Sequence, residues 1–237
     1  MTICYTSLQS IPTMKNSIAA GLLLLVSLTS AQQGAPVGYA SQNGGTTGGK
    51  GGTTVTVTSL AELTAAVGKK TDTTAKIIYI KGAITGSAKI NIGSNKSIVG
   101  IDSSASLTGV GLYIDNSKNV IVQNLKISKV LATNGDAIGI QASTNVWVDH
   151  VDVSSDIDHG KDYYDGLIDV THASDWVTVS NSYIHDHYKA SLVGHSDNNG
   201  AQDKGHLRVT YANNYWNNIS SRTPSVRFGT AHIFNST

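Results

Sequence analysis

The chain has 237 residues, a formal net charge of +1 and 14% charged residues, with 24 glycines and 3 prolines. Charged residues usually make up about a quarter of a soluble domain, and a near-neutral chain lacks the basic surface that binds nucleic acid. We therefore exclude nucleic acid as a partner. The abundant Gly, Ser, Thr, Asn and Val indicate many short strands and tight turns.

The N-terminal region has the pattern of a secretory signal. Met14 and Lys15 precede an apolar stretch of 11 residues, 18–28, and small residues follow up to Ala31. This stretch is too short to cross a bilayer, so we predict cleavage after Ala31, an extracellular product and no membrane anchor. The predicted segments are a spurious upstream extension at 1–13, a signal peptide at 14–31 and one domain at 32–237.

The predicted domain has no cysteine, since Cys4 lies in the upstream extension. Its stability is therefore expected to come from packing and hydrogen bonds. The Gly-rich and Thr-rich stretch 44–53 is interpreted as a loop, because no strand-then-helix pattern of a phosphate site surrounds it. Residues 59–67 are the helical candidate: Ser59 can cap the helix and Glu62 stands three residues on, as in a capping box. We expect this helix to cover the N-terminal end of the fold.

The middle of the chain repeats one pattern. Residues 120–127 match residues 146–153 at an offset of 26, residues 177–184 follow at 31 more, and residues 209–216 follow at 32 more. Each unit alternates apolar and polar residues, as a strand does. A single unit cannot bury its apolar face alone, so the repeat predicts a β solenoid of stacked coils.

One column of this alignment holds polar residues at a bend, namely Asn124, His150, Asn181 and Asn213. Stacked amides and imidazoles can hydrogen-bond along the solenoid axis, so we interpret all four as a ladder and favour this role for His150 over a catalytic one. Trp147, Trp176 and Trp216 lie within repeats and are assigned to the core or the coil surface.

Charged residues gather on successive later segments. Asp165 and Asp169 lie close together, Lys189 follows on the next segment, and Arg222 and Arg227 flank Pro224. Carboxylates bind hard cations, guanidinium groups bind carboxylated ligands, and a neutral arginine can remove a proton. The combination predicts calcium-assisted cleavage of an acidic polymer.

Four motifs in this order resemble those of secreted fungal pectate lyases of the pectate lyase A type, in the parallel β-helix family of polysaccharide lyases. The resemblance covers the chain from about Gly44 to the end. The motifs are NVWVDH at 145–150, DGLID at 165–169, SDWVTVS at 174–180 and RTPSVRFG at 222–229.

The resemblance implies an all-β, right-handed, single-stranded parallel β-helix. It implies calcium-dependent eliminative cleavage of (1→4)-α-D-galacturonan, the polygalacturonate of plant cell-wall pectin, giving 4,5-unsaturated oligogalacturonates. We expect the protein to be a monomer that binds this polymer. By motif position, the calcium ligands are Asp136, Asp165 and Asp169, the base is Arg222, and the binders of substrate carboxylates are Lys189 and Arg227.

These site assignments require two bends in the backbone. A straight strand would separate Asp165 from Asp169 by about 13 Å, so a bend is required, and Gly166 permits one. Arg222 and Arg227 would point to opposite faces of a flat strand, so a kink at Pro224 is needed for them to converge. Lys189, Arg227 and calcium would each favour the neutral form of Arg222.

Other interpretations stay open for single residues. Asp136 equally fits a turn-capping role, Lys189 a solvated surface lysine, and the two arginines a brace between coils. Asn134 stands where related lyases often carry a further acidic ligand, which predicts weaker calcium binding. Tyr163 and Tyr164 are candidates for a groove wall.

Three alternative functions share part of this pattern. A pectin lyase, acting on methyl-esterified substrate, would replace the three retained aspartates. A polygalacturonase is suggested only by Asp158-His159-Gly160, without the rest of its pattern. A non-catalytic pectin-binding β-helix, or an inactive fragment, is the alternative from a different class.

The chain stops at residues 233–237, within what resembles another strand and turn. The expected consequence is a fragment that lacks C-terminal coils of the solenoid. Glycosylation sequons predict a glycoprotein with acceptor sites at Asn95, Asn218 and Asn235.

Overall fold

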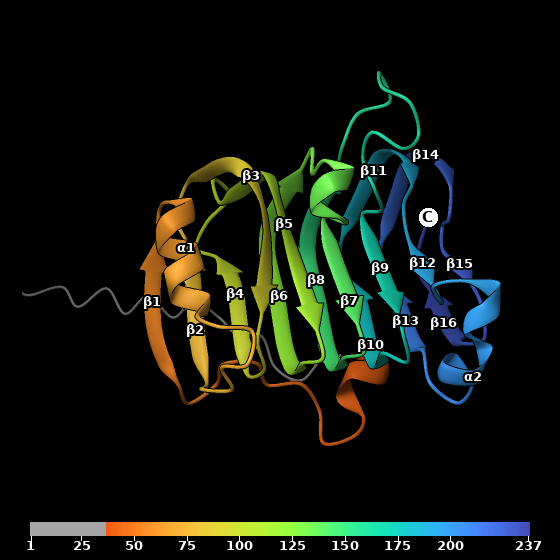
Figure 1. Ribbon diagram of the computed structural model, residues 1–237, viewed down its shortest axis with the longest axis horizontal. Helices are drawn as coiled ribbons and strands as arrows, with labels where there is room; N and C mark the ends of the chain where they lie inside the picture. The colour runs from red at the N-terminus through yellow and green to blue at the C-terminus, as the bar shows by residue number, and fades with distance from the viewer. Residues whose placement is uncertain (1–36) are drawn as a thin grey trace, which may run out of the picture. The chain divides into compact units, whose positions relative to one another are not determined.

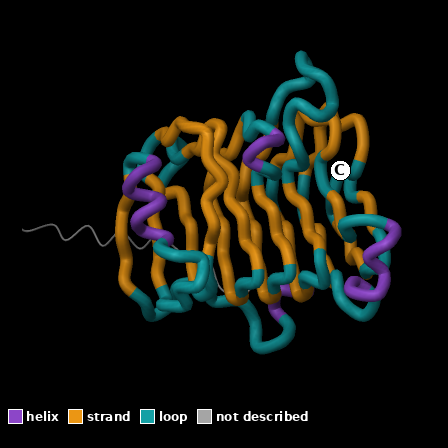
Figure 2. The backbone as a smooth tube through the Cα atoms, viewed as in Figure 1, coloured by secondary structure: helices purple, strands orange, loops and turns teal. Residues whose placement is uncertain are grey.

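The computed structural model describes residues 37–237, which form a parallel β-helix (Figure 1). The strands join one 16-stranded sheet in which each strand pairs in parallel with strands of neighbouring coils. Figure 2 shows these strands side by side, with loops gathered where the coils turn. The predicted all-β solenoid is confirmed.

The elements follow one another in short steps. The strands are β1 (Thr53–Val57), β2 (Lys76–Ile80), β3 (Ala83–Ile92), β4 (Lys96–Gly100), β5 (Ser106–Asp115), β6 (Lys118–Ser128), β7 (Ile138–Gln141), β8 (Thr144–Ser154), β9 (Ile168–Thr171), β10 (Asp175–Ser180), β11 (Tyr183–Lys189), β12 (Leu192–Val193), β13 (Arg208–Ala212), β14 (Tyr215–Ser221), β15 (Ser225–Val226) and β16 (Thr230–Phe234). The helices in this range are α1 (Leu60–Val67), α2 (Gly200–Asp203), and the 3-10 helices η1 (Tyr39–Ser41), η2 (Ala132–Asn134) and η3 (Asp197–Asn199).

The repeat read from the sequence sets the register of the coils. Val146 in β8 pairs with Val120 in β6 and with Val177 in β10, which pairs in turn with Val209 in β13. All four side chains are fully buried. Because matching positions stack, apolar residues of successive coils form one continuous core, and burying each such side chain contributes about 1.5–3 kcal/mol.

The predicted polar column lies at a bend in every coil. Asn124, His150, Asn181 and Asn213 all have positive φ, between 49° and 58°. Asn213 Nδ2 donates to Asn181 Oδ1 at 3.0 Å, but Asn181 Nδ2 donates to Asp149, and the His150 ring also contacts Asp149 at 2.7 Å. The ladder is therefore confirmed only between Asn181 and Asn213, and the prediction that Asn124 and His150 are further rungs is wrong. The buried Asp149 carboxylate takes the place of His150.

A second asparagine column supports the loop before β1. Asn95, Asn119 and Asn145 all have positive φ, and Asn119 Nδ2 donates to Asn95 Oδ1 at 2.8 Å. Asn119 Oδ1 accepts from the backbone N–H groups of Thr47 and Gly48 at 2.7 and 2.8 Å. The stretch before Thr53 is thus a loop, as predicted, and it lies along the turns of the coils.

Helix α1 begins as predicted, with the Ser59 hydroxyl accepting from the Glu62 N–H. The Glu62 carboxylate accepts from the Thr58 N–H at 2.7 Å rather than reaching Ser59, so the capping box is incomplete. The helix buries Leu63, Ala66 and Val67 against the first coils. It lies between β1 and β2 in the chain.

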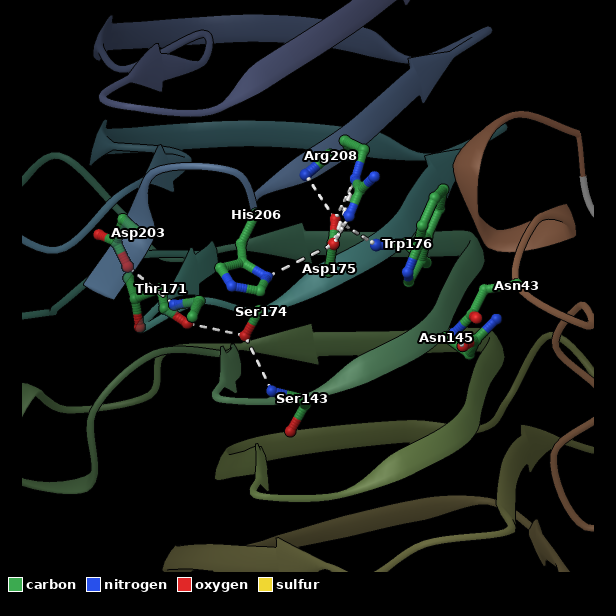
Figure 3. A network of polar contacts seen from close by, with 11 residues as sticks. Asn43, Ser143, Asn145, Thr171, Ser174, Asp175, Trp176, Asp203, His206 and Arg208 are labelled. Carbon is green, nitrogen blue, oxygen red and sulfur yellow. Dashed lines mark hydrogen bonds and ion pairs between the residues drawn. The ribbon is translucent and has the colours of Figure 1, made fainter. Parts of the chain in front are cut away.

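The three tryptophans have structural roles, as expected. Trp147 is buried and donates to Ser180, and Trp216 packs against the core. Figure 3 shows Trp176 beside Arg208, whose guanidinium carbon lies 3.7 Å from the ring centroid. Arg208 also pairs with the buried Asp175 across neighbouring coils. Such a cation between a ring and a carboxylate joins β10 to β13.

Some predictions fall outside this description. The upstream extension at 1–13 and the signal at 14–31 lie outside the described residues. Within residues 37–237, each helix is too short or too polar to cross a membrane.

Replacing Asn119 by alanine tests the second column. We expect Asn119→Ala to lower the free energy of unfolding by about 2–3 kcal/mol, because it removes several hydrogen bonds and because alanine tolerates positive φ less well than asparagine. Asn119→Gly keeps the backbone conformation accessible and should lose less. Guanidinium denaturation of the three proteins measures the difference. A loss for Asn119→Ala below about 0.5 kcal/mol, the range of ordinary surface changes, would contradict this role.

Candidate functional site

Two carboxylates converge over one glycine. Asp136 precedes β7 and Asp169 lies in β9, the next coil along. The Gly166 N–H donates to Asp136 Oδ1 at 2.8 Å. A Cβ on Gly166 would lie 2.7 Å from Asp136 Oδ1 and 2.5 Å from Asp169 Oδ1. The chain bends at the neighbouring Leu167, and Gly166 provides the room that both carboxylates require.

Asp169 is held from two directions. Its Oδ1 accepts from the Leu192 N–H of β12 at 2.9 Å, and its Oδ2 lies 4.0 Å from Arg222 Nη1. The residue is buried, with 7% of its surface exposed. The backbone bond to the next coil fixes the carboxylate, and the guanidinium partly balances its charge.

The carboxylates repel one another in this position. Burial, followed by the nearby Asp165 charge, raises the pKa of Asp136 to about 6. Burial, followed by the Asp136 charge, raises the pKa of Asp169 well above the ordinary value. Both directions have the same physical cause, because negative charges gather in a poorly solvated place. A bound cation would relieve both.

The donor set suits calcium, which prefers six to eight oxygen ligands, including carboxylates and water. Asp136, Asp165 and Asp169 supply only oxygen. Within residues 37–237, no three His, Cys, Asp or Glu side chains are grouped tightly enough to form a ready-made metal cage. Asp136 and Asp169 meet over Gly166, while Asp165 lies beside Lys189, so a calcium ion held here would need water or substrate oxygens to complete its shell.

Lys189 lies beside this acidic cluster, at the end of β11. Its Nζ is 3.1 Å from Asp162 Oδ1 and 3.6 Å from Asp165 Oδ1, and only 15% of its side chain is exposed. It is therefore not a freely solvated lysine. The sequence does not reveal Asp162 as a partner of Lys189, because it lies in the loop between β8 and β9, outside the repeated strands.

The two arginines have different partners. Arg222 directly follows β14, has a φ of 65°, and faces Asp169. The predicted kink is present, with bends at Thr223 and Pro224. Arg227 instead pairs with Asp197 of η3, Nε to Oδ1, at 2.6 Å. The structure thus brings Arg222 and Lys189 to the acidic cluster and holds Arg227 at a neighbouring surface.

The aromatic residues beside the cluster divide between surface and interior. Tyr163 is 47% exposed and stacks on His159, whereas Tyr164 is buried and its hydroxyl donates to Asp156 at 2.7 Å. His159 also contacts Asp156. Tyr163 can therefore line a surface, and Tyr164 supports the loop from within. Asn134 donates to Ser87.

Comparisons with known proteins identify the family. A family model described as pectate lyase matches residues 12–237. The chain belongs to the pectate lyase family. It is 68% identical over 207 residues to "Probable pectate lyase A" of Aspergillus fumigatus, covering 87% of this chain and 64% of that protein. It is 62% identical over 205 residues to "Probable pectate lyase B" of Aspergillus flavus, covering 86% and 62%.

Solved structures agree with this membership in the pectate lyase family. A Bacillus pectate lyase determined in complex with trigalacturonate has a TM-score of 0.75 and 33% identity, over 85% of this chain and 67% of that one. A thermostable pectate lyase has a TM-score of 0.77 and 28% identity, over 84% and 69%. The two Aspergillus proteins are longer than this chain, which spans less than two thirds of the length of each.

The repulsion at Asp136 predicts a pH-dependent gain in stability when the charge is removed. With a pKa of about 6 against an ordinary 3.8, the folded protein binds more protons than the unfolded chain between these values. The protonated form of Asp136 favours the folded state. Its contribution to stability is complete below about pH 4 and is lost as the pH rises through about 6. We expect Asp136→Asn, with chelator present, to stabilise the protein at pH 7 by about 1–2 kcal/mol, discounted for partial exposure.

Thermal unfolding at pH 4 and pH 7 measures this gain. The difference between Asp136→Asn and the native protein should vanish at pH 4. Asp162→Asn is the matched control, because Lys189 lowers the pKa of Asp162 and removal of that carboxylate should not stabilise. A destabilised Asp136→Asn protein at pH 7 would show that the carboxylate is a structural cap instead.

Proposed function

We propose that this chain is a calcium-dependent pectate lyase that cleaves (1→4)-α-D-galacturonan by elimination and releases 4,5-unsaturated oligogalacturonates. Its membership in the family, the names of its fungal relatives and the trigalacturonate of the Bacillus structure support this substrate class. The observation that carries the proposal is the convergence of Asp136 and Asp169 over Gly166, with Arg222 beside Asp169 and Lys189 beside Asp165.

The reaction removes the proton at C5 of a galacturonate and breaks the C4–O bond. The C5–H electron pair forms the C4=C5 double bond, and the leaving oxygen takes up a proton. Negative charge develops next to the C6 carboxylate, so that carboxylate must be neutralised. Calcium bound by Asp136, Asp165 and Asp169 would supply this neutralisation as a Lewis acid.

The cationic residues have separate tasks in this proposal. Arg222 accepts the C5 proton as the general base. Lys189 binds a substrate carboxylate. Arg227, now paired with the exposed Asp197, can exchange that partner for another substrate carboxylate, because an exposed ion pair is weak.

The cellular setting belongs to the same proposal. A signal at residues 14–31 would direct the domain at 32–237 out of the cell, where pectin is found. The secreted enzyme would act as a monomer. Glycan addition at Asn218 would place a sugar near Arg222 in the sequence.

Ultraviolet absorbance of unsaturated product tests the activity. Purified protein should release product from polygalacturonate with calcium and none with excess chelator. Arg222→Lys should reduce the rate by about 10²-fold or more, because it removes the proposed base. Arg208→Lys is the control, since Arg208 pairs with Asp175 away from this cluster, and its activity should be unchanged.

The other outcomes of this assay separate the alternatives. Product only from methyl-esterified pectin, without calcium dependence, would indicate a pectin lyase. Calcium-dependent binding of polygalacturonate by a folded protein without product would indicate a non-catalytic pectin-binding protein.

Calcium is also expected to stabilise the protein in the absence of substrate. A ligand present at about 100 times its Kd stabilises by about 2.7 kcal/mol, so saturating calcium should raise the Tm measurably. Asp169→Asn removes one central ligand and should abolish most of this shift. Magnesium serves as the ion control, because it demands a smaller and more regular site. An equal Tm shift in Asp169→Asn would place the bound calcium elsewhere.

A further inference from the structure

A long loop separates two coils next to the acidic cluster. The chain leaves β8 at Ser154 and returns in β9 at Ile168. Figure 1 shows this loop projecting beyond the ends of the strands, near β11. Its last residues include Asp165, a proposed calcium ligand, so the loop must be held firmly where it rejoins the solenoid.

His187 lies where the loop replaces a paired strand. In β11, His185 still pairs with Ser154 of β8, and this pairing then stops. His187 pairs with Ile219 of β14 on its other side. On the side of β8, β11 therefore has no paired strand beyond His185.

The His187 ring contacts both ends of the loop. Its Nδ1 lies 2.6 Å from the Ser155 hydroxyl, at the start of the loop, and its Nε2 lies 2.5 Å from the carbonyl oxygen of Asp165, at the end. The residue is only 2% exposed. The Ser155 hydroxyl also lies 3.0 Å from the Asp186 carbonyl oxygen, in β11 itself.

These partners determine the tautomer of the ring. A carbonyl oxygen can only accept, so Nε2 must carry the hydrogen that binds Asp165. In this tautomer Nδ1 carries no hydrogen and accepts the single hydrogen of the Ser155 hydroxyl. Both ring nitrogens are thus satisfied, with one directed bond to each end of the loop.

We propose that His187 is a positioning residue that clamps the two ends of the 155–165 loop and thereby holds Asp165 in place beside Asp136 and Asp169. The calcium-related half of this inference rests on the proposed function, whereas the clamp itself does not. Replacing a residue that hydrogen-bonds to a metal ligand and orients it typically weakens metal binding about 10–100-fold.

The clamp is tested first without calcium, by trypsin. Lys161 is exposed near the middle of the loop, so cleavage after it reports how often the loop opens. We expect His187→Leu to be cut there at least about fivefold faster than the native protein, because two buried hydrogen bonds are lost. Mass spectrometry identifies the site. Unchanged cleavage at Lys161 would overturn the clamp.

The position of Asp165 is tested by calorimetric titration of the folded proteins with calcium alone. His187→Leu should raise the calcium Kd about tenfold. His187→Gln can still donate to the Asp165 carbonyl oxygen and should recover most of the affinity. Faster cleavage with a native calcium Kd would confirm the clamp and overturn its role in placing Asp165.

His185→Leu is the matched control. His185 lies two residues earlier in β11 and also makes two hydrogen bonds, to Asp152 and Asp186, but neither reaches the 155–165 loop. The His185→Leu substitution should change neither cleavage at Lys161 nor the calcium Kd.

If His187→Leu fails to fold, Ser155→Ala removes one end of the clamp and should itself accelerate cleavage. A native protein that binds no calcium would contradict the proposed function while leaving the trypsin result to decide the clamp.

Discussion

Parallel pairing in register is the constraint on which this structure depends. Because each strand lies directly against its counterpart one coil away, every position in a coil is repeated as a column. Apolar columns form the core, as with Val122, Val148 and Val179, and amide columns form hydrogen-bonded ladders. The same stacking brings Asp136 and Asp169, which lie far apart in the sequence, to either side of one glycine.

The repeating parts were predictable, since a column needs matching residue types at similar spacing. The strands around residues 120, 146, 177 and 209 were found in this way. His150 was misassigned because the alignment shows which residue stands in a column but not its hydrogen-bond partner. The column of Asn95, Asn119 and Asn145 was missed because its main partner is the loop before β1, which lies outside the repeat.

Within the candidate site, residue types were predictable and their neighbours were not. Motifs pointed to the three aspartates, and the structure brings Arg222 to Asp169 and Lys189 to Asp165. Gly166 was expected to permit a bend, whereas its lack of a Cβ also gives two carboxylates room. Asp162 and His187 were missed because the loop between β8 and β9 has its own length, so no repeat predicts what it contacts.

The buried carboxylates of Asp136 and Asp169 repel one another, while Arg222 and Lys89 supply positive charge nearby. The proposal that a calcium ion completes this site rests on that repulsion. The most direct test is a crystal structure of the Arg222→Lys protein with calcium and a galacturonate oligomer. We expect a calcium ion at about 2.3–2.6 Å from oxygens of Asp136, Asp165 and Asp169, with substrate carboxylate completing its shell. Calcium bound elsewhere, with these three carboxylates free of it, would contradict the proposal.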